Sequence, residues 1–168
     1  MKNNRLIWYI VAFVVIVLIQ VGIMNNLQFS GLVNPYFYIL FILLLPVNIP
    51  HYLLLLLGFA LGISIDIFTN TPGIHASATV FASFIRPFLF NSYNFDEKEK
   101  VLVPTLHNIG FKSFVRYALL MIIIHHFFLF FIEVFSFSGF LYTLIRAVLS
   151  SIFTFVVVLI SQFLIFRK

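Results

Sequence analysis

The sequence predicts an all-α integral membrane protein with six transmembrane helices. Two features of its composition exclude an ordinary soluble domain, because 62% of the 168 residues are hydrophobic and only 9% are charged. Soluble domains have roughly half of their residues apolar and about a quarter charged. The third observation is a series of long apolar segments, several of them near the roughly 20 residues that a helix needs to cross a bilayer. We therefore expect a single transmembrane domain over residues 1–168.

The first two predicted spans differ in quality. Residues 6–24 are interrupted only by Gln20, and at about 1.5 Å per residue they can cross roughly 30 Å of hydrocarbon. The segment 36–49 is shorter than the first span, contains Pro46 and is followed by Pro50. Because proline removes a backbone donor and disrupts a helix, we expect this second span to be short, tilted or partly re-entrant.

The third and fourth predicted spans form a hairpin. Residues 51–68 make the third span, with Asp66 about one turn inside its end, and residues 73–90 make the fourth. Between them Thr71 is a suitable N-cap and Pro72 suits the first helical position. The fourth span carries several polar or small residues at helical spacing, which places them on one face. These residues are His75, Thr79, Ala82 and Arg86.

The remaining elements are one polar connection and two spans. Residues 91–113 contain a run of mixed charge from Asp96 to Lys100 and are predicted to be a cytoplasmic loop or a surface-lying helix. Residues 114–135 form the fifth span and residues 140–166 the sixth.

The distribution of lysine and arginine predicts the orientation. With six spans and both termini in the cytoplasm, nine of these residues fall on the inner side and Arg146 alone falls towards the outside. The nine are Lys2, Arg5, Arg86, Lys98, Lys100, Lys112, Arg116, Arg167 and Lys168. This orientation places Asp66 and the turn after it near the outer face.

Asp66 is the residue most indicative of function. Gly58, Gly62 and Asp66 follow one another at intervals of four, so they share one stripe of a helix. The two glycines allow another helix to approach closely, and an ionisable residue inside a span marks either a functional site or a buried structural partner. Both interpretations of Asp66 stay open on the sequence.

Few other residues indicate chemistry. Asp66, Glu133 and Arg146 fall in the outer part of the predicted bundle and are candidates for an intramembrane polar cluster, although Arg146 is also placed to snorkel to the interface. His125 and His126 are adjacent and point about 100° apart on a helix, which argues against a shared metal ligand. We expect no catalytic residues, no metal, no cofactor and no nucleic-acid partner.

The stretch around Asp66 resembles a known family. Gly62-Ile-Ser-Ile-Asp66, followed by Phe68-Thr-Asn-Thr-Pro-Gly73-Ile-His75-Ala76, is similar to the signature region of the rod shape-determining MreD family. The resemblance implies a non-enzymatic protein of the bacterial inner membrane. It also implies that Gly58, Gly62, Asp66, Pro72, Gly73 and His75 belong to a structural or partner-binding motif.

The resemblance further implies a set of partners. The direct one is an MreC-like protein with a single span and a periplasmic part, embedded in the same lipid. The further partners, contacted directly or indirectly, are the elongation-specific glycan polymerase and transpeptidase and the actin-like filament protein. Together these proteins control rod shape and lateral peptidoglycan synthesis. The alternative is a small-ligand binding or transport subunit, because the family shares a six-helix arrangement with vitamin transporter subunits.

Overall fold

The computed structural model describes residues 2–27, 32–92, 103–135 and 139–165, and its regular elements there are helices. In chain order they are α1 (Lys2–Gly22), the 3₁₀ turn η1 (Met24–Asn26), α2 (Ile39–Leu43), α3 (His51–Thr69), α4 (Ile74–Ser92), α5 (Leu106–Ile109), α6 (Phe111–Val134) and α7 (Phe140–Ile165). The five long helices begin and end within a few residues of the predicted bounds.

Among the described residues, four segments are long and apolar enough to cross a membrane. They are Leu6–Asn26, His51–Thr69, Phe111–Val134 and Phe140–Ile165. The apolar part of α4, Ile74–Phe90, is shorter. The charged run from Asp96 to Lys100 and the terminal Arg167 and Lys168, on which the predicted orientation partly depends, lie outside the described residues.

The predicted second span, 36–49, is not a continuous helix. Only Ile39–Leu43 is helical, and this short α2 ends before Pro46 because proline cannot supply the next backbone donor. Every residue of 36–43 is nevertheless buried. The segment that was expected to be short, tilted or partly re-entrant is therefore a buried, mostly irregular chain with one helical turn in it.

Polar side chains of the long helices accept hydrogen bonds from backbone amides of this irregular segment. The Asn34 amide donates to Ser150 Oγ at 2.9 Å and the Tyr36 amide donates to Thr154 Oγ1 at 3.0 Å, both on α7. The Tyr38 amide donates to Gln20 Oε1 of α1 at 3.1 Å. Non-helical backbone is tolerated at membrane depth only where protein groups meet its hydrogen bonds, and these three contacts meet that condition.

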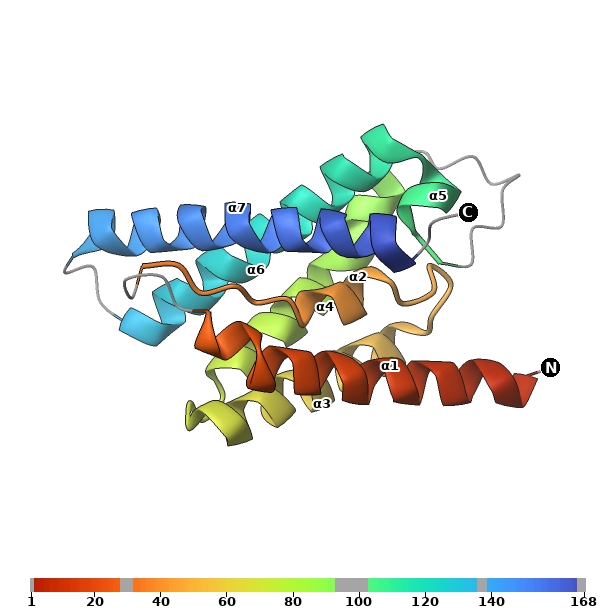
Figure 1. Ribbon diagram of the computed structural model, residues 1–168, viewed down its shortest axis with the longest axis horizontal. Coiled ribbons are helices and arrows are strands. Elements are labelled where there is room, and N and C mark those ends of the chain that lie inside the picture. Colours follow the sequence, from red (N-terminus) through yellow and green to blue (C-terminus); the bar gives the residue numbers. More distant parts are fainter. Residues whose placement is uncertain (1, 28–31, 93–102, 136–138, 166–168) are drawn as a thin grey trace.

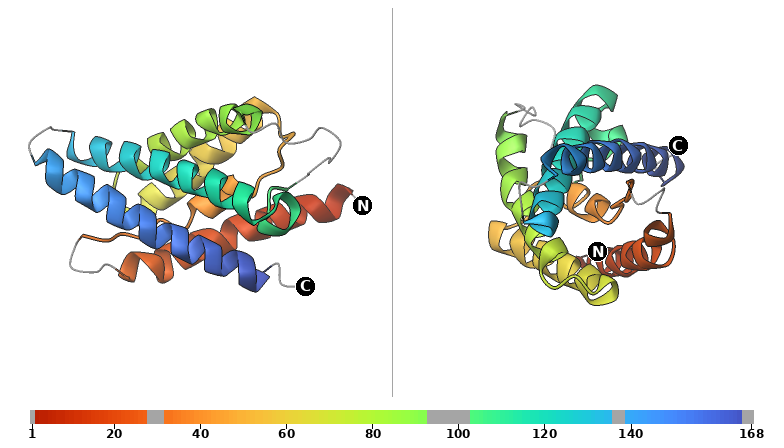
Figure 2. Two further views of the ribbon diagram at one scale, coloured as in Figure 1. Left: turned by 90° about the horizontal axis from the view of Figure 1, so that it is seen from above. Right: turned by 90° about the vertical axis from the view of Figure 1, so that its left-hand side faces the viewer.

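The long helices surround α2. Figure 1 shows the start of α1 and the end of α7 at one end of the bundle, while the α3–α4 turn lies at the opposite end. In the end-on view of Figure 2, α2 occupies the centre and the long helices lie around it. Helix α4 packs against both α3 and α6, and α6 packs against α7. Along 6–22 of α1 only Ile16, Val17 and Gln20 are buried, so this helix presents most of its apolar surface outward.

Candidate functional site at the hairpin of α3 and α4

The two glycines of α3 allow it to lie directly against α4. A Cβ atom on Gly62 would overlap the Cα atom of Ala76 and the hydroxyl of Thr79. A Cβ atom on Gly58 would meet the hydroxyl of Ser83 and would lie 3.1 Å from the carbonyl oxygen of Thr79. Small residues are what permit such a backbone approach in a membrane, where lipid offers no hydrophobic drive between helices.

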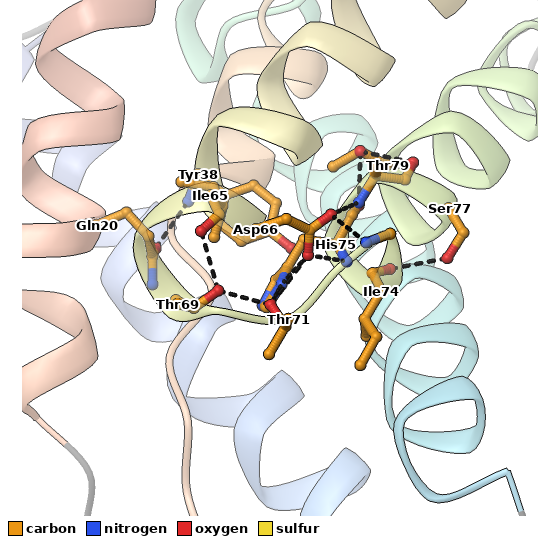
Figure 3. A network of polar contacts seen from close by, with 12 residues as sticks. Gln20, Tyr38, Ile65, Asp66, Thr69, Thr71, Ile74, His75, Ser77 and Thr79 are labelled. Carbon is orange, nitrogen blue, oxygen red and sulfur yellow. Dashed lines mark hydrogen bonds and ion pairs between the residues drawn. The ribbon is translucent and has the colours of Figure 1, made fainter.

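The same stripe of α3 ends in Asp66, whose carboxylate accepts hydrogen bonds from backbone amides at the start of α4 (Figure 3). Its Oδ1 accepts from the His75 amide at 3.0 Å. Its Oδ2 accepts from the Ala76 amide at 2.9 Å and from the Gly73 amide at 3.1 Å. The first amides of a helix have no acceptor within that helix, and a negative charge beside them is favourable. Asp66 therefore caps the following helix from the preceding one.

A side-chain pair completes this cap. His75 Nδ1 lies 2.9 Å from Asp66 Oδ1, and the two residues are 4% and 3% exposed. Thr71 Oγ1 donates to the same oxygen at 3.0 Å and lies 2.9 Å from His75 Nδ1. We assign the Nδ1 proton of a neutral His75 to the bond with Asp66, because the carboxylate accepts only. This assignment leaves Nε2 as an acceptor.

The turn itself corrects the predicted capping residues. The prediction that Thr71 would cap the helix is wrong, because Asp66 accepts from the α4 amides and Thr71 donates its hydroxyl to Asp66. Pro72 precedes α4, which begins at Ile74. Asn70 and Gly73 have φ angles of 57° and 84°, the left-handed region that asparagine and glycine adopt most readily.

The proposed three-residue cluster is divided into two pairs. Arg146 Nη2 lies 3.3 Å from Glu133 Oε1, and the Arg146 guanidinium lies 4.6 Å from the ring centroid of Phe130. Asp66 pairs with His75 instead. The physical reason is that both oxygens of Asp66 are already engaged by its own hairpin. Arg146 is thus placed in an ion pair with Glu133, and its side chain is 13% exposed.

A second polar centre, which spacing alone did not reveal, lies at the far end of α4. Arg86 is 1% exposed, its Nε donates to Tyr117 Oη at 2.9 Å and its Nη1 donates to the Pro46 carbonyl at 3.3 Å. Its Nη2 donates to the Leu45 carbonyl, and Tyr117 Oη donates to the Leu43 carbonyl. Arg86 thus donates hydrogen bonds to backbone carbonyls that follow the end of α2 and have no acceptor role within a helix. These pairings could not be predicted from the sequence, because the acceptors are backbone atoms on a distant segment.

The buried histidines of α6 contact different partners. His125 Nε2 lies 2.9 Å from Tyr38 Oη, whereas His126 Nε2 lies 3.0 Å from Thr154 Oγ1 and its Nδ1 lies 2.9 Å from the Ile122 carbonyl. Their rings point to different groups, as adjacent helical positions require. Across the described ranges, no group of three His, Asp or Glu side chains is placed to hold a metal ion.

The arrangement around Asp66 is suited to fixing a helix hairpin. The carboxylate accepts from three backbone amides and from Thr71 and contacts His75, so its hydrogen-bonding capacity is used within residues 66–76. A fully satisfied buried polar group of this kind makes its surroundings rigid. Comparisons with protein-family models, curated proteins and solved structures find no match for this chain.

Proposed function

We propose that this chain is a non-enzymatic scaffold of the bacterial cell-elongation machinery, placed in the inner membrane and bound to an MreC-like single-span partner. The observation that carries the proposal is the Asp66 cap. Its carboxylate serves the hairpin that contains the family-like stretch, and each residue of the proposed motif shapes that hairpin or lies in its turn. A rigid, presented turn is what a binding scaffold requires.

The proposed topology has six crossings, with the irregular segment 32–50 serving as the second. Both termini then lie in the cytoplasm and the α3–α4 turn lies at the outer face. Two features support this topology. The start of α1 and the end of α7 lie at the same end of the bundle (Figure 1). Lysine and arginine are also concentrated towards that end in the sequence-based assignment.

The partner surface is proposed to lie at the exposed tip of the hairpin. Ile67 is 72% exposed, and Phe68, Asn70 and Pro72 beside it are also exposed. This tip combines apolar side chains at the end of a span with a polar turn beyond it. A single-span partner offers the complementary pair of surfaces, because its helix crosses the same membrane boundary and its following segment leaves the bilayer.

The test is co-purification of the full chain with an MreC-like protein from the same genome. We expect Ile67→Trp to reduce the recovered partner at least about tenfold, because the added indole blocks the tip. Ile160→Trp on α7 is the matched control, since Ile160 is also exposed, at 52%, but lies on another helix. Both variants should insert and unfold like the wild type.

Two results would contradict the proposal: equal recovery of the partner with both variants, or no recovery with the wild type. Cell shape provides a second readout in a rod-shaped host that depends on this protein. Loss of the chain should round the cells, and the Ile160→Trp form should restore rods where the Ile67→Trp form does not. Lateral peptidoglycan synthesis should follow the same order, because the polymerase, transpeptidase and filament protein act with the partner.

A further inference from the structure

A polar cavity of about 360 Å³ lies beside the Asp66 cap. The turn η1, the start of the 32–50 segment, the α3–α4 hairpin and the end of α6 contribute to its wall. The lining residues that matter for its chemistry are Asn34, Tyr36, Phe68, Thr69, His75 and Glu133. Its volume is within the range of about 300–1,000 Å³ that is typical of small-molecule sites. Phe68 and Glu133 are both exposed, so the cavity reaches the surface.

His75 gives this cavity a buried polar atom that the protein itself does not use. Its Nδ1 faces Asp66, while its Nε2 is buried and has no hydrogen-bond partner among the described residues. Asn34 Oδ1 is in the same condition. With the Nδ1 proton bonded to Asp66, both atoms are acceptors. A buried acceptor without a donor costs free energy, so these two atoms favour a ligand that supplies donors.

The charges at the cavity favour a cation. Glu133 contributes a carboxylate to the wall, and Asp66 places a second carboxylate behind His75. Arg146 pairs with Glu133, so the one positive guanidinium offsets only one of the two negative carboxylates. Tyr36 and Phe68 add aromatic rings, whose faces attract a positive charge. An anionic ligand would meet this net negative charge and a wall whose unpartnered atoms only accept.

We propose that this cavity binds a small organic amine. Its ammonium donates to His75 Nε2 and to the Glu133 carboxylate, and its carbon chain lies against Tyr36 and Phe68. Asp66 contributes by holding the His75 ring and its tautomer, and is a positioning residue. The ligand site and the scaffold function are tested at different residues, because Ile67 is not part of the cavity wall, although Phe68 belongs to both the hairpin tip and that wall.

The probe is 1,5-diaminopentane, titrated by calorimetry into the full chain in lipid nanodiscs. The neutral 1,5-pentanediol and the dianion glutarate have a similar length and serve as matched ligands. We expect saturable binding of the diamine and none of the other two. Glu133→Gln should weaken diamine binding by about tenfold, since a hydrogen bond to a charged group is lost. Arg146→Gln should strengthen it severalfold, because the competing cation is removed.

The opposite signs of the two variants separate ligand binding from a structural role. Both substitutions break the same ion pair, so a purely structural effect would move the diamine affinity in one direction. Absence of saturable diamine binding, equal binding of the diol, or an unchanged affinity in Glu133→Gln would each overturn the proposal. Recovery of the MreC-like partner should be the same with and without the diamine, which distinguishes failure of this site from failure of the scaffold function.

Discussion

The two ends of α4 are both anchored by a buried charged residue, but they are built differently. At its start, Asp66 accepts from amides no more than ten positions away along the chain. At its end, Arg86 donates to carbonyls about forty positions away and to Tyr117 on α6. The first anchor closes a hairpin between neighbours in sequence. The second connects α4 and α6 to the irregular segment 32–50 at the centre of the bundle, called the central segment below. This anchor therefore depends on the whole bundle being assembled.

This difference predicts a larger loss of stability at the Arg86 end. We expect Arg86→Met to lower the free energy of unfolding by about 4 kcal/mol, because hydrogen bonds of a charged donor are lost, and the buried carbonyl of Leu45 and the partly buried carbonyl of Pro46 lose their donor. Thermal unfolding in micelles and protease sensitivity near 44–50 measure the effect. Lys112→Gln removes an exposed cation and is the control. Equal stability of the two variants would remove Arg86 from its role as an anchor.

The Asp66 end should be weakened next. Asp66→Ala removes the acceptor of three backbone amides and is expected to cost about 3 kcal/mol of unfolding free energy. Asp66→Asn keeps one carbonyl oxygen and should lose less. Glu133→Gln is the matched acid-to-amide control at a more exposed pair. Hydrogen exchange of the His75 and Ala76 amides should quicken in Asp66→Ala, and unchanged protection there would contradict the cap.

The close contact between the helices gives a third test, which does not involve charge. Gly62→Ala places a methyl group against Ala76 and Thr79 and should cost about 2 kcal/mol through overpacking. Gly22→Ala on α1 is the control, because a Cβ atom there meets nothing within 4 Å. The control should be neutral or slightly stabilising, since alanine favours a helix over glycine. A tolerant Gly62 would mean that the α3–α4 spacing is adjustable.

The smallest effect is expected at the Glu133–Arg146 pair. Its side chains are 35% and 13% exposed, and the atoms are 3.3 Å apart. Ion pairs of this kind contribute about 0–1 kcal/mol, so Arg146→Gln should change thermal unfolding little. The measurement is the same unfolding experiment, run beside Arg86→Met. If the two arginine variants were equally destabilised, the deeper burial of Arg86 would not be what separates it from the less buried Glu133–Arg146 pair.

The local anchor was visible in the sequence and the distant one was not. Gly58, Gly62 and Asp66 fall on one stripe by spacing alone, and all three are buried against α4. His75, Thr79, Ala82 and Arg86 were predicted to share a face, and all are buried. Spacing reports which residues share a face, but it does not report the partner across the interface. The Asp66–His75 pair and the contacts of Arg86 with the central segment therefore required the structure.

The second predicted span shows the same limit from the backbone side. Pro46 and Pro50 indicated an irregular segment, and helix α2 is indeed limited to Ile39–Leu43. What composition cannot reveal is that Gln20, Ser150 and Thr154 supply the acceptors for its free amides. These residues look like ordinary polar interruptions of apolar helices. Their role follows from where the central segment lies.

The position of that segment has a consequence for the order in which the protein is completed. Asn34 and Tyr36 leave the ribosome early, yet their acceptors Ser150 and Thr154 lie 116 and 118 residues later. Contacts this distant form late and slow the closure of a fold. The amides of the central segment therefore lack these acceptors until α7 has been synthesised, so the bundle closes around this segment only after synthesis is complete. A chain truncated before α7 would lack the acceptors of the Asn34 and Tyr36 amides.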